Sequence, residues 1–185
     1  YAEPDLRSPI RDFLPRHSAV VVGRSGLMTR GTDYAALDTG AFLPLPCLSP
    51  RPPVSADLVA AAELYLGCPY LWAGRSMRGL DCSALVQNAF RDLGITVARD
   101  TDQQRDTIGA RVTAEAIEEL RRGDLLYMPG HVLIFAGGDR FIHADGATMA
   151  VRHDHLVQWL TAYRLALSDF VIRRPDAIRA EVRSS

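Results

Sequence analysis

The sequence of 185 residues contains no lysine, and all 21 of its basic residues are arginine. Schiff-base catalysis and the lysine-dependent phosphate loop are therefore excluded. The net charge is only −1, so no field of one sign favours nucleic acid or a membrane surface. No apolar run approaches the roughly 20 residues of a membrane-spanning helix. We expect no nucleic-acid partner and no membrane span, and the oligomeric state stays open.

Cysteine is also scarce, with only Cys47, Cys68 and Cys82, and no pair has the CxxC spacing. An odd number without paired spacing argues against a disulfide framework and against a zinc ribbon. The sequence therefore predicts no metal and no cofactor. Cys47 and Cys68 lack a helix-start context, and we expect both to be packing residues.

A signal peptide is not visible, because the first residues lack a basic segment followed by an apolar one. Together with three unpaired cysteines, this favours a cytoplasmic protein. The sequence does not begin with Met, so a leader removed from the N-terminus stays open, and with it a periplasmic or secreted location.

Residues 1–50 are rich in glycine and proline, which separate short apolar segments such as 19–22. Short strands with frequent turn residues are typical of a small β-barrel. Residues 51–54 include Pro52 and Pro53 and are predicted to form a linker, because consecutive prolines suit neither a helix nor a central strand. Residues 55–185 are predicted to form a second domain.

In the second domain, helices precede strands, which indicates an α+β fold. Ser55 is expected to cap a helix that runs to about Leu66, and a second helix is expected to begin near Cys82 and to stop at Gly94. Shorter helices are predicted near 101–108 and 114–120. Strands are predicted at 125–128, 132–136, 140–143, 149–152 and 170–173.

Cys82 stands at the expected start of a helix, where free N–H groups and the helix dipole favour a thiolate. Its own N–H could help to hold an oxyanion. The plainer interpretation is a small buried residue. The aromatic, turn-rich segment just upstream, which contains Tyr70 and Trp72, favours a working thiol, although either ring could also belong to the core.

A thiol nucleophile needs an imidazole within hydrogen-bond reach and a group that orients the imidazole. His131 opens one apolar strand and His143 ends the next, with Gly137 in the turn. In a register centred on Gly137 the two histidines share a face, whereas a slip of one residue separates them unless a bulge corrects it. Two structural histidines are the alternative. His153 and His155 are expected in a polar turn, where a metal role stays open.

Several segments together resemble one family. They are Pro69–Gly74 (PYLWAG), Gly79–Val86 (GLDCSALV), Arg99–Thr101 (RDT), Arg122–Leu125 (RGDL), Gly130–Val132 (GHV) and Ile142–Ala144 (IHA). In order and spacing they resemble the NlpC-type papain-like cysteine peptidases of bacteria, over about residues 55–175. The family often has glycine where Ala73 and Ala84 stand.

The resemblance implies a papain-like core, in which a helical part with the cysteine packs on an antiparallel sheet with both histidines. It implies Cys82 as nucleophile, His131 as general base and His143 as the orienting residue, with Tyr70 and the N–H of Cys82 at the oxyanion site. It also implies an SH3-type domain over residues 1–50. The residues expected to line the substrate cleft are Trp72, Asp81, Ser83, Arg99, Asp100 and Thr101.

The reaction that the resemblance implies is cleavage of the γ-D-glutamyl bond to a diamino acid in murein stem peptides, with release of L-Ala-γ-D-Glu during murein recycling. Asp81 could bind a substrate ammonium group or simply cap the helix. Arg99 could meet the D-Glu α-carboxylate or solvate a loop.

Three other functions stay open at this stage. An amidase or acyltransferase would use the same cysteine and histidines. An inactive murein-binding module would bind without hydrolysis, although such a module need not keep Cys82, His131 and His143. A metallohydrolase would use His153 and His155 instead.

Overall fold

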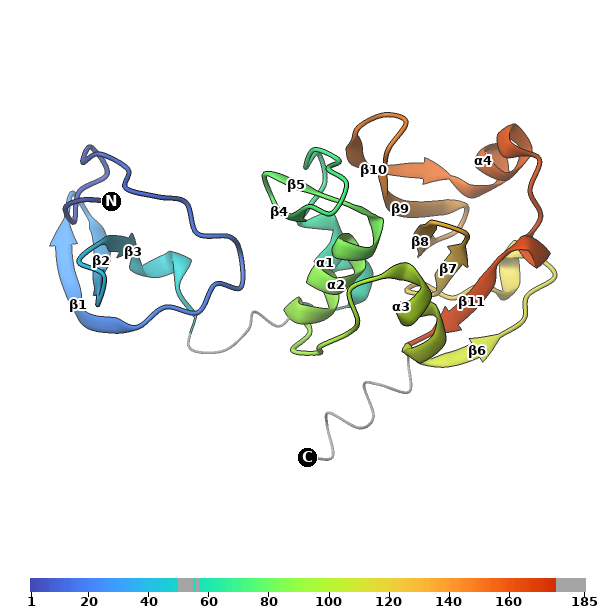
Figure 1. Cartoon of the computed structure of the whole chain (residues 1–185), viewed down its shortest axis with the longest axis horizontal. Helices are drawn as coiled ribbons and strands as arrows, with labels where there is room; N and C mark the ends of the chain where they lie inside the picture. The colour runs from blue at the N-terminus through green and yellow to red at the C-terminus, as the bar shows by residue number, and fades with distance from the viewer. Residues whose placement is uncertain (50–54, 56, 176–185) are drawn as a thin grey trace. The chain divides into compact units, whose positions relative to one another are not determined.

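The computed structural model describes residues 1–49, 55 and 57–175. The chain separates into two compact units, Tyr1–Pro53 and Val54–Ser185 (Figure 1). The predicted linker at 51–54 lies outside the described residues, as does the chain after 175.

The first unit contains an antiparallel sheet in the order β1-β2-β3, formed by β1 (Val22–Thr29), β2 (Thr32–Leu37) and β3 (Phe42–Pro44). Its buried side chains include Tyr34 and Ala35 on the middle strand. The segment 19–22 enters a strand only at Val22. Within residues 1–49 the structure assigns these three strands and no closed barrel, so the SH3-type barrel stays a prediction.

A short 3-10 helix, Leu45–Cys47, follows β3. Cys47 is exposed there, so the prediction that it packs in a core is wrong. The prediction for Cys68 is confirmed, because its side chain is buried in the second unit.

The second unit is built on an antiparallel sheet in the order β10-β9-β8-β7-β11-β6. All five predicted strands are present, and β6 was not predicted. The strands are β6 (Ala110–Val112), β7 (Leu125–Met128), β8 (His131–Gly137), β9 (Arg140–Asp145), β10 (Ala150–His155) and β11 (Val171–Arg174). A separate two-stranded ribbon, formed by β4 (Arg75–Ser76) and β5 (Gly79–Leu80), precedes the second helix in the sequence.

Four helices pack around the described part of this sheet: α1 (Leu58–Glu63), α2 (Cys82–Asp92), α3 (Thr101–Thr107) and α4 (Leu156–Tyr163). The first is shorter than predicted, because Asp57 rather than Ser55 caps it, and Oδ1 of Asp57 accepts from the N–H of Ala60 at 2.8 Å. The helix expected at 114–120 is only a 3-10 turn, Ile117–Glu119, and α4 was not predicted. None of the described helices has the length and apolar character needed to cross a bilayer.

The two faces of the sheet carry separate hydrophobic cores. On one face α1 and α2 pack against alternate residues such as Val132, Ile134 and Ile142. On the other face α4 packs against the intervening residues, including Phe135 and Phe141. Figure 1 shows this layering, with α1 and α2 on one side of the strands and α4 on the other. The alternation follows from the two-residue period of a strand, and the α+β prediction is confirmed.

Candidate active site

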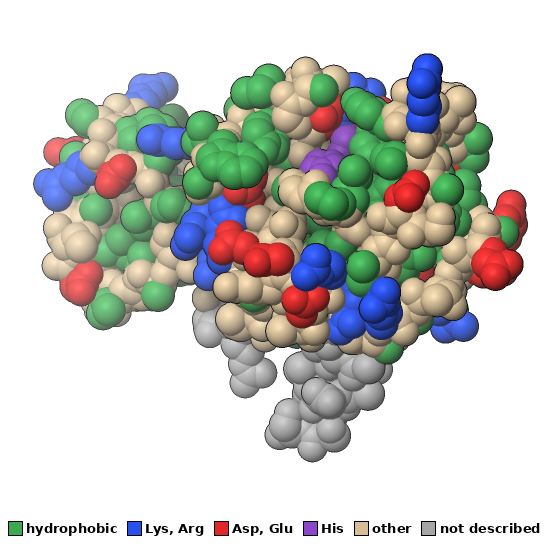
Figure 2. All heavy atoms as spheres, turned by 45° about the vertical axis from the view of Figure 1, so that its right-hand side comes forward, with side chains coloured by type: hydrophobic (Ala, Val, Ile, Leu, Met, Phe, Trp, Pro, Cys, Tyr) green, Lys and Arg blue, Asp and Glu red, His purple; other side chains and the backbone are tan. Residues whose placement is uncertain are grey.

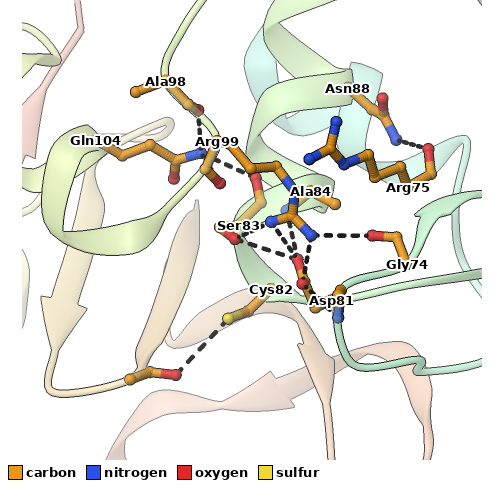
Figure 3. Close-up of polar contacts among 12 residues, drawn as sticks. Gly74, Arg75, Asp81, Cys82, Ser83, Ala84, Asn88, Ala98, Arg99 and Gln104 are labelled. Atoms are coloured by element: carbon orange, nitrogen blue, oxygen red, sulfur yellow. Dashed lines mark hydrogen bonds and ion pairs between the residues drawn. The ribbon is translucent and has the colours of Figure 1, made fainter.

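Cys82 is the first residue of α2, as the sequence predicted. The helix begins there because Asp81 caps it, with Oδ1 accepting from the N–H of Ala84 at 2.8 Å. Apolar residues at helical spacing place one side of α2 in the hydrophobic core. Gly94 follows the last turn of the helix with a φ of 77°. The sulfur lies 3.8 Å from the carbonyl oxygen of Gly130, just before β8 (Figure 3).

Opposing effects act on the Cys82 thiol. Burial raises its pKa, and the negative charge of Asp81 raises it further. The N–H groups of Val132, Ser83 and Cys82 itself lower the pKa, but they do not reverse the shift. The resting side chain is therefore a neutral thiol at neutral pH, and it would need a base to become a thiolate.

The two histidines meet on one face of the sheet. Nε2 of His131 lies 2.9 Å from Nδ1 of His143. The register is not the one centred on Gly137, because Ile134 pairs with Ile142 and the ladder is irregular next to Gly137. The correct register is displaced by an even number of residues, so the shared face is retained and the histidines form a diagonal pair.

His143 is buried and His131 is partly buried. Burial lowers the pKa of His131 to about 4, and the neighbouring His143 adds to the effect. Burial also lowers the pKa of His143, although its hydrogen bond with Asp154 opposes the shift. Trp159 of α4 covers both rings, with centroids 6.5 Å from that of His131 and 6.4 Å from that of His143. Both imidazoles are neutral at pH 7 and able to accept a proton.

A cavity of about 360 Å³ opens beside Cys82. All six residues that were predicted to bind substrate line it, and so do Ala73, Arg75 and Gly130, which were not predicted. Its wall contains the exposed ring of Trp72, 77% accessible. Figure 2 shows hydrophobic side chains gathered around surface histidine atoms on one face of the second unit. The lining thus combines charged and polar side chains with one exposed aromatic ring.

Arg99 and Asp81 organise the polar wall (Figure 3). The guanidinium of Arg99 donates to both carboxylate oxygens of Asp81, to the hydroxyl of Ser83 at 2.6 Å and to the carbonyl of Gly74 at 3.3 Å. Burial alone would raise the pKa of Asp81, but the hydrogen bonds from Arg99 and from the Ala84 N–H lower it. Asp81 therefore both caps α2 and balances Arg99, and any substrate ammonium group would share it with Arg99.

Gln104 fixes the short helix α3 next to the cavity. Its fully buried amide donates to the carbonyl oxygens of Ser83 and Ala98, both at 2.9 Å. These bonds hold the start of α3 against α2 and place Asp100 and Thr101 at the cavity. Asp100 precedes α3, but its side chain does not cap the helix.

Tyr70 is close enough to Cys82 for a charge on the sulfur to act on its hydroxyl, but it is not among the residues that line the cavity. Its backbone N–H bonds to the carbonyl of Met149 at 2.9 Å, and its ring packs against Gly146. Burial raises the pKa of Tyr70, and charge on Cys82 and Asp81 would raise it further. The hydroxyl therefore stays protonated and can donate a hydrogen bond.

Ala73 has a φ of 60°, a left-handed conformation that glycine adopts without strain. The conformation turns its N–H toward Oδ2 of Asp81, at 3.0 Å. The next residue, Gly74, has no room for a side chain, because a Cβ would lie 2.4 Å from the carbonyl oxygen of Gly79.

His153 and His155 lie in β10, so the predicted polar turn is wrong. Each has its own acidic partner: His153 Nε2 lies 3.1 Å from Oε1 of Glu63, and His155 Nδ1 lies 3.4 Å from Oδ2 of Asp139. Across the described ranges 1–49, 55 and 57–175, no three His, Cys, Asp or Glu side chains come together as a metal site would require.

Sequence reasoning missed Arg75, Gly130, Asp154 and Trp159. Gly130 belongs to the GHV segment, and Arg75 directly follows the PYLWAG segment. Both could therefore have been placed near the cavity from the sequence. Asp154 and Trp159 follow the last motif, and only the pairing of β10 and the packing of α4 bring them to the histidines.

Comparison with known proteins agrees with this geometry. Residues 67–167 match the family model described as the NlpC/P60 family. The chain is 32% identical over 112 residues to dipeptidyl-peptidase 6 of Lysinibacillus sphaericus, covering 60% of this chain and 40% of that protein. It is 33% identical over 107 residues to γ-D-glutamyl-L-lysine dipeptidyl-peptidase of Bacillus cereus, covering 54% of this chain and 31% of that protein.

A solved structure of an NlpC/P60 family protein from Bacillus cereus superimposes with a TM-score of 0.61 at 28% identity, over 78% of this chain and 50% of that one. The chain thus spans less than half the length of the two curated relatives. The family match covers more than half of this sequence and includes Cys82, His131 and His143. The chain belongs to the NlpC/P60 family.

Proposed function

We propose that this protein is a cysteine peptidase that cleaves murein stem peptides at the bond between γ-D-Glu and a diamino acid. The observation that carries the proposal is that all the predicted substrate-binding residues line one cavity together with Cys82. The hydrogen-bonded pair of His131 and His143 supports it. The names of two relatives, a dipeptidyl-peptidase and a γ-D-glutamyl-L-lysine dipeptidyl-peptidase, suggest the bond.

In the proposed reaction Cys82 is the nucleophile and His131 is the base. The thiol proton passes from Sγ to His131 as sulfur attacks the γ-carbonyl carbon. Nε2 of His131 is occupied by His143, so Nδ1 is the nitrogen that takes the proton. The same proton then goes to the leaving amine, which gives a thioester, and a water activated by His131 hydrolyses the thioester.

The oxyanion of the tetrahedral intermediate is held by the N–H of Cys82 and the hydroxyl of Tyr70. Cys82 is the first residue of α2, where the N–H groups have no partner within the helix. The raised pKa of Tyr70, caused first by burial, keeps its hydroxyl as a donor. Preorganised donors of this kind contribute about 3 kcal/mol each to the stabilisation of a transition state.

The charges of the cavity suit a small zwitterionic substrate. Arg99 and Asp81 neutralise each other. Arg75 and Asp100 line the same cavity, and among the described residues neither side chain has a hydrogen bond or ion pair (Figure 3 shows Arg75). We assign Arg75 to the free α-carboxylate of γ-D-Glu, and Asp100, with Asp81, to the free amino group of L-Ala.

Incubation with L-Ala-γ-D-Glu-diaminopimelate and with L-Ala-γ-D-Glu-L-Lys tests the proposal. Mass spectrometry should detect the dipeptide L-Ala-γ-D-Glu, and Cys82→Ala should abolish its release. An N-acetylated substrate should be cleaved more slowly, because it has no ammonium group for the carboxylates of the cavity. Equal cleavage of free and acetylated substrates would remove the amine-recognition part of the proposal.

Three further assays separate the alternative functions. Turnover of a thioester substrate without release of dipeptide would identify an amidase or acyltransferase. Binding of murein without hydrolysis, unchanged in Cys82→Ala, would identify a binding module. Full activity after thiol alkylation, lost on treatment with a chelator, would identify a metallohydrolase.

A further inference from the structure

A carboxylate outside the cavity lies in direct contact with the histidine pair. Oδ2 of Asp154 lies 3.1 Å from Nε2 of His143, a side chain that is only 1% exposed. Arg152 pairs with His143 across β10 and β9, so Asp154, two residues further along, lies on the same face of the sheet. A continuous line of contacts thus runs from His131 through His143 to Asp154.

These contacts decide where two neutral imidazoles carry their protons. A carboxylate only accepts hydrogen bonds, so His143 carries its proton on Nε2, where it faces Asp154. Nδ1 of His143 is then an acceptor, and Nε2 of His131 donates to it across 2.9 Å. His131 is left with a lone pair on Nδ1, which is the tautomer that can take a proton from a thiol.

Arg152 holds Asp154 in this orientation. Its Nη2 lies 2.5 Å from Oδ1 of Asp154, the oxygen that does not contact His143. Each carboxylate oxygen therefore has its own partner, and rotation of the carboxylate would break both contacts. Arg152 and Asp154 both lie in β10, which pairs with β9 along its whole length.

We propose that Asp154 is a positioning residue that fixes the tautomer of His143 and, through it, the tautomer in which His131 accepts the proton of Cys82. The inference rests on the proposed role of His131 as the base. In that step the S–H bond breaks and an N–H bond forms on Nδ1, which leaves a thiolate and an imidazolium. The negative charge of Asp154 then faces this positive charge across His143.

Other charges act on the same groups and are unchanged in the test. Asp145 of β9 affects the pKa of both histidines, Arg152 of β10 affects that of His143, and Asp81 of α2 affects that of Cys82. Burial lowers the pKa of His143, so at pH 7 it holds one ring proton, and the position of that proton matters.

Alkylation of Cys82 by iodoacetamide tests the inference without any substrate. A Cys47→Ser background removes the exposed thiol, and Cys68 is buried. In this background Asp154→Asn should lower the alkylation rate about tenfold or more at neutral pH, because the amide of Asn can donate to Nε2 of His143 and reverse both tautomers. Asp154→Glu keeps an acceptor and should lose less.

Glu63→Gln is the matched control. Glu63 lies 3.1 Å from His153 of β10, so this substitution also replaces a carboxylate by an amide beside a histidine. His153 lies on the opposite face of the strand from Asp154. The alkylation rate of Glu63→Gln should equal that of the background protein. Equal rates in Asp154→Asn and Glu63→Gln would overturn the inference.

Nitrogen-15 NMR of the unsubstituted protein gives a second test that does not depend on the folding of a variant. His143 and His131 should each be protonated on Nε2, and a proton on Nδ1 of His143 would overturn the inference. The proposed function is tested separately. Reduced alkylation in Asp154→Asn, in a protein that cleaves no murein peptide, would reject the peptidase while the inference stands.

Discussion

Arg99 and Asp81 form a two-point ion pair in the wall of the cavity, with Nη2 2.6 Å from Oδ2 and Nη1 3.0 Å from Oδ1. The side chains are only 15% and 10% exposed. Removal of one partner from such a pair leaves a poorly solvated charge, which costs more than the pair itself contributes.

Arg99→Leu should therefore lower the free energy of unfolding by about 3 kcal/mol. Arg99→Lys should lower it less, because the charge remains although the two-point geometry is lost. Urea unfolding of each variant measures the change. Arg105→Leu is the control, because its pair with Asp106 is exposed, and its effect should stay within about 1 kcal/mol. Equal effects of Arg99→Leu and Arg105→Leu would contradict this prediction.

Ala73→Gly and Ala84→Gly should change stability in opposite directions. Ala73 has a φ of 60°, which glycine adopts without strain, so Ala73→Gly should raise the free energy of unfolding by up to about 1 kcal/mol. Ala84 is buried in the first turn of α2, so Ala84→Gly should lower it by about 1 kcal/mol. Thermal and urea unfolding of the two variants, measured side by side, provide the comparison. Destabilisation by both would show that φ at Ala73 is not a source of strain.

Arg75→Gln should weaken substrate binding while chemistry continues. The proposed contact with the α-carboxylate of γ-D-Glu is lost, so KM should rise about tenfold or more and kcat should change less. Substrates with an α-amide should be cleaved equally by the parent protein and by Arg75→Gln. Arg91→Gln, an exposed change near the end of α2, should behave as the parent. An unchanged KM in Arg75→Gln would remove Arg75 from the substrate site.

Substitutions in the proposed catalytic group should not be additive. Cys82→Ala and His131→Ala should each reduce kcat by a factor of about 10⁴ or more, and the double variant should be little worse, because the two act as one unit. His143→Ala should retain more activity, because water can replace part of its orienting hydrogen bond. A loss in His143→Ala as large as in Cys82→Ala, in a folded protein, would assign His143 a more direct role.

Stability should fall in mild acid because of His131. Its pKa is about 4 in the folded protein against 6.5 ordinarily, so between these values the unfolded chain binds a proton that the folded protein does not. The free energy of unfolding is unaffected by this group well above pH 6.5 and falls progressively as the pH drops toward 4, by roughly 3 kcal/mol in total. His143, whose pKa burial also lowers, acts in the same direction.

Urea unfolding at neutral pH and near pH 5 measures this loss, and the dependence should be smaller in His131→Gln. The carboxylates whose pKa values are lowered, such as Asp81, lose their contribution only at still lower pH. The rate of substrate cleavage should likewise persist below pH 6.5, because His131 stays neutral there. A steep loss of activity centred at pH 6.5 would show that the imidazole is solvated.

The sequence by itself determined the local elements that carry the proposed chemistry. Asp81 is a strong N-cap, apolar residues recur at helical spacing after Cys82, and Gly94 permits the left-handed turn that ends α2. Hydrogen bonds over three or four residues decide such an element, so its position can be predicted from neighbours alone. The same holds for the strands that flank the turn at Gly137.

Only the tertiary structure decided which side chains meet. The register of β8 on β9 makes His131 and His143 a diagonal pair, and the register of β10 on β9 places Asp154 beside them. Packing of α4 brings Trp159 over the rings. These contacts depend on strand pairing and on helix packing summed over two hydrophobic cores, and a short sequence window contains neither.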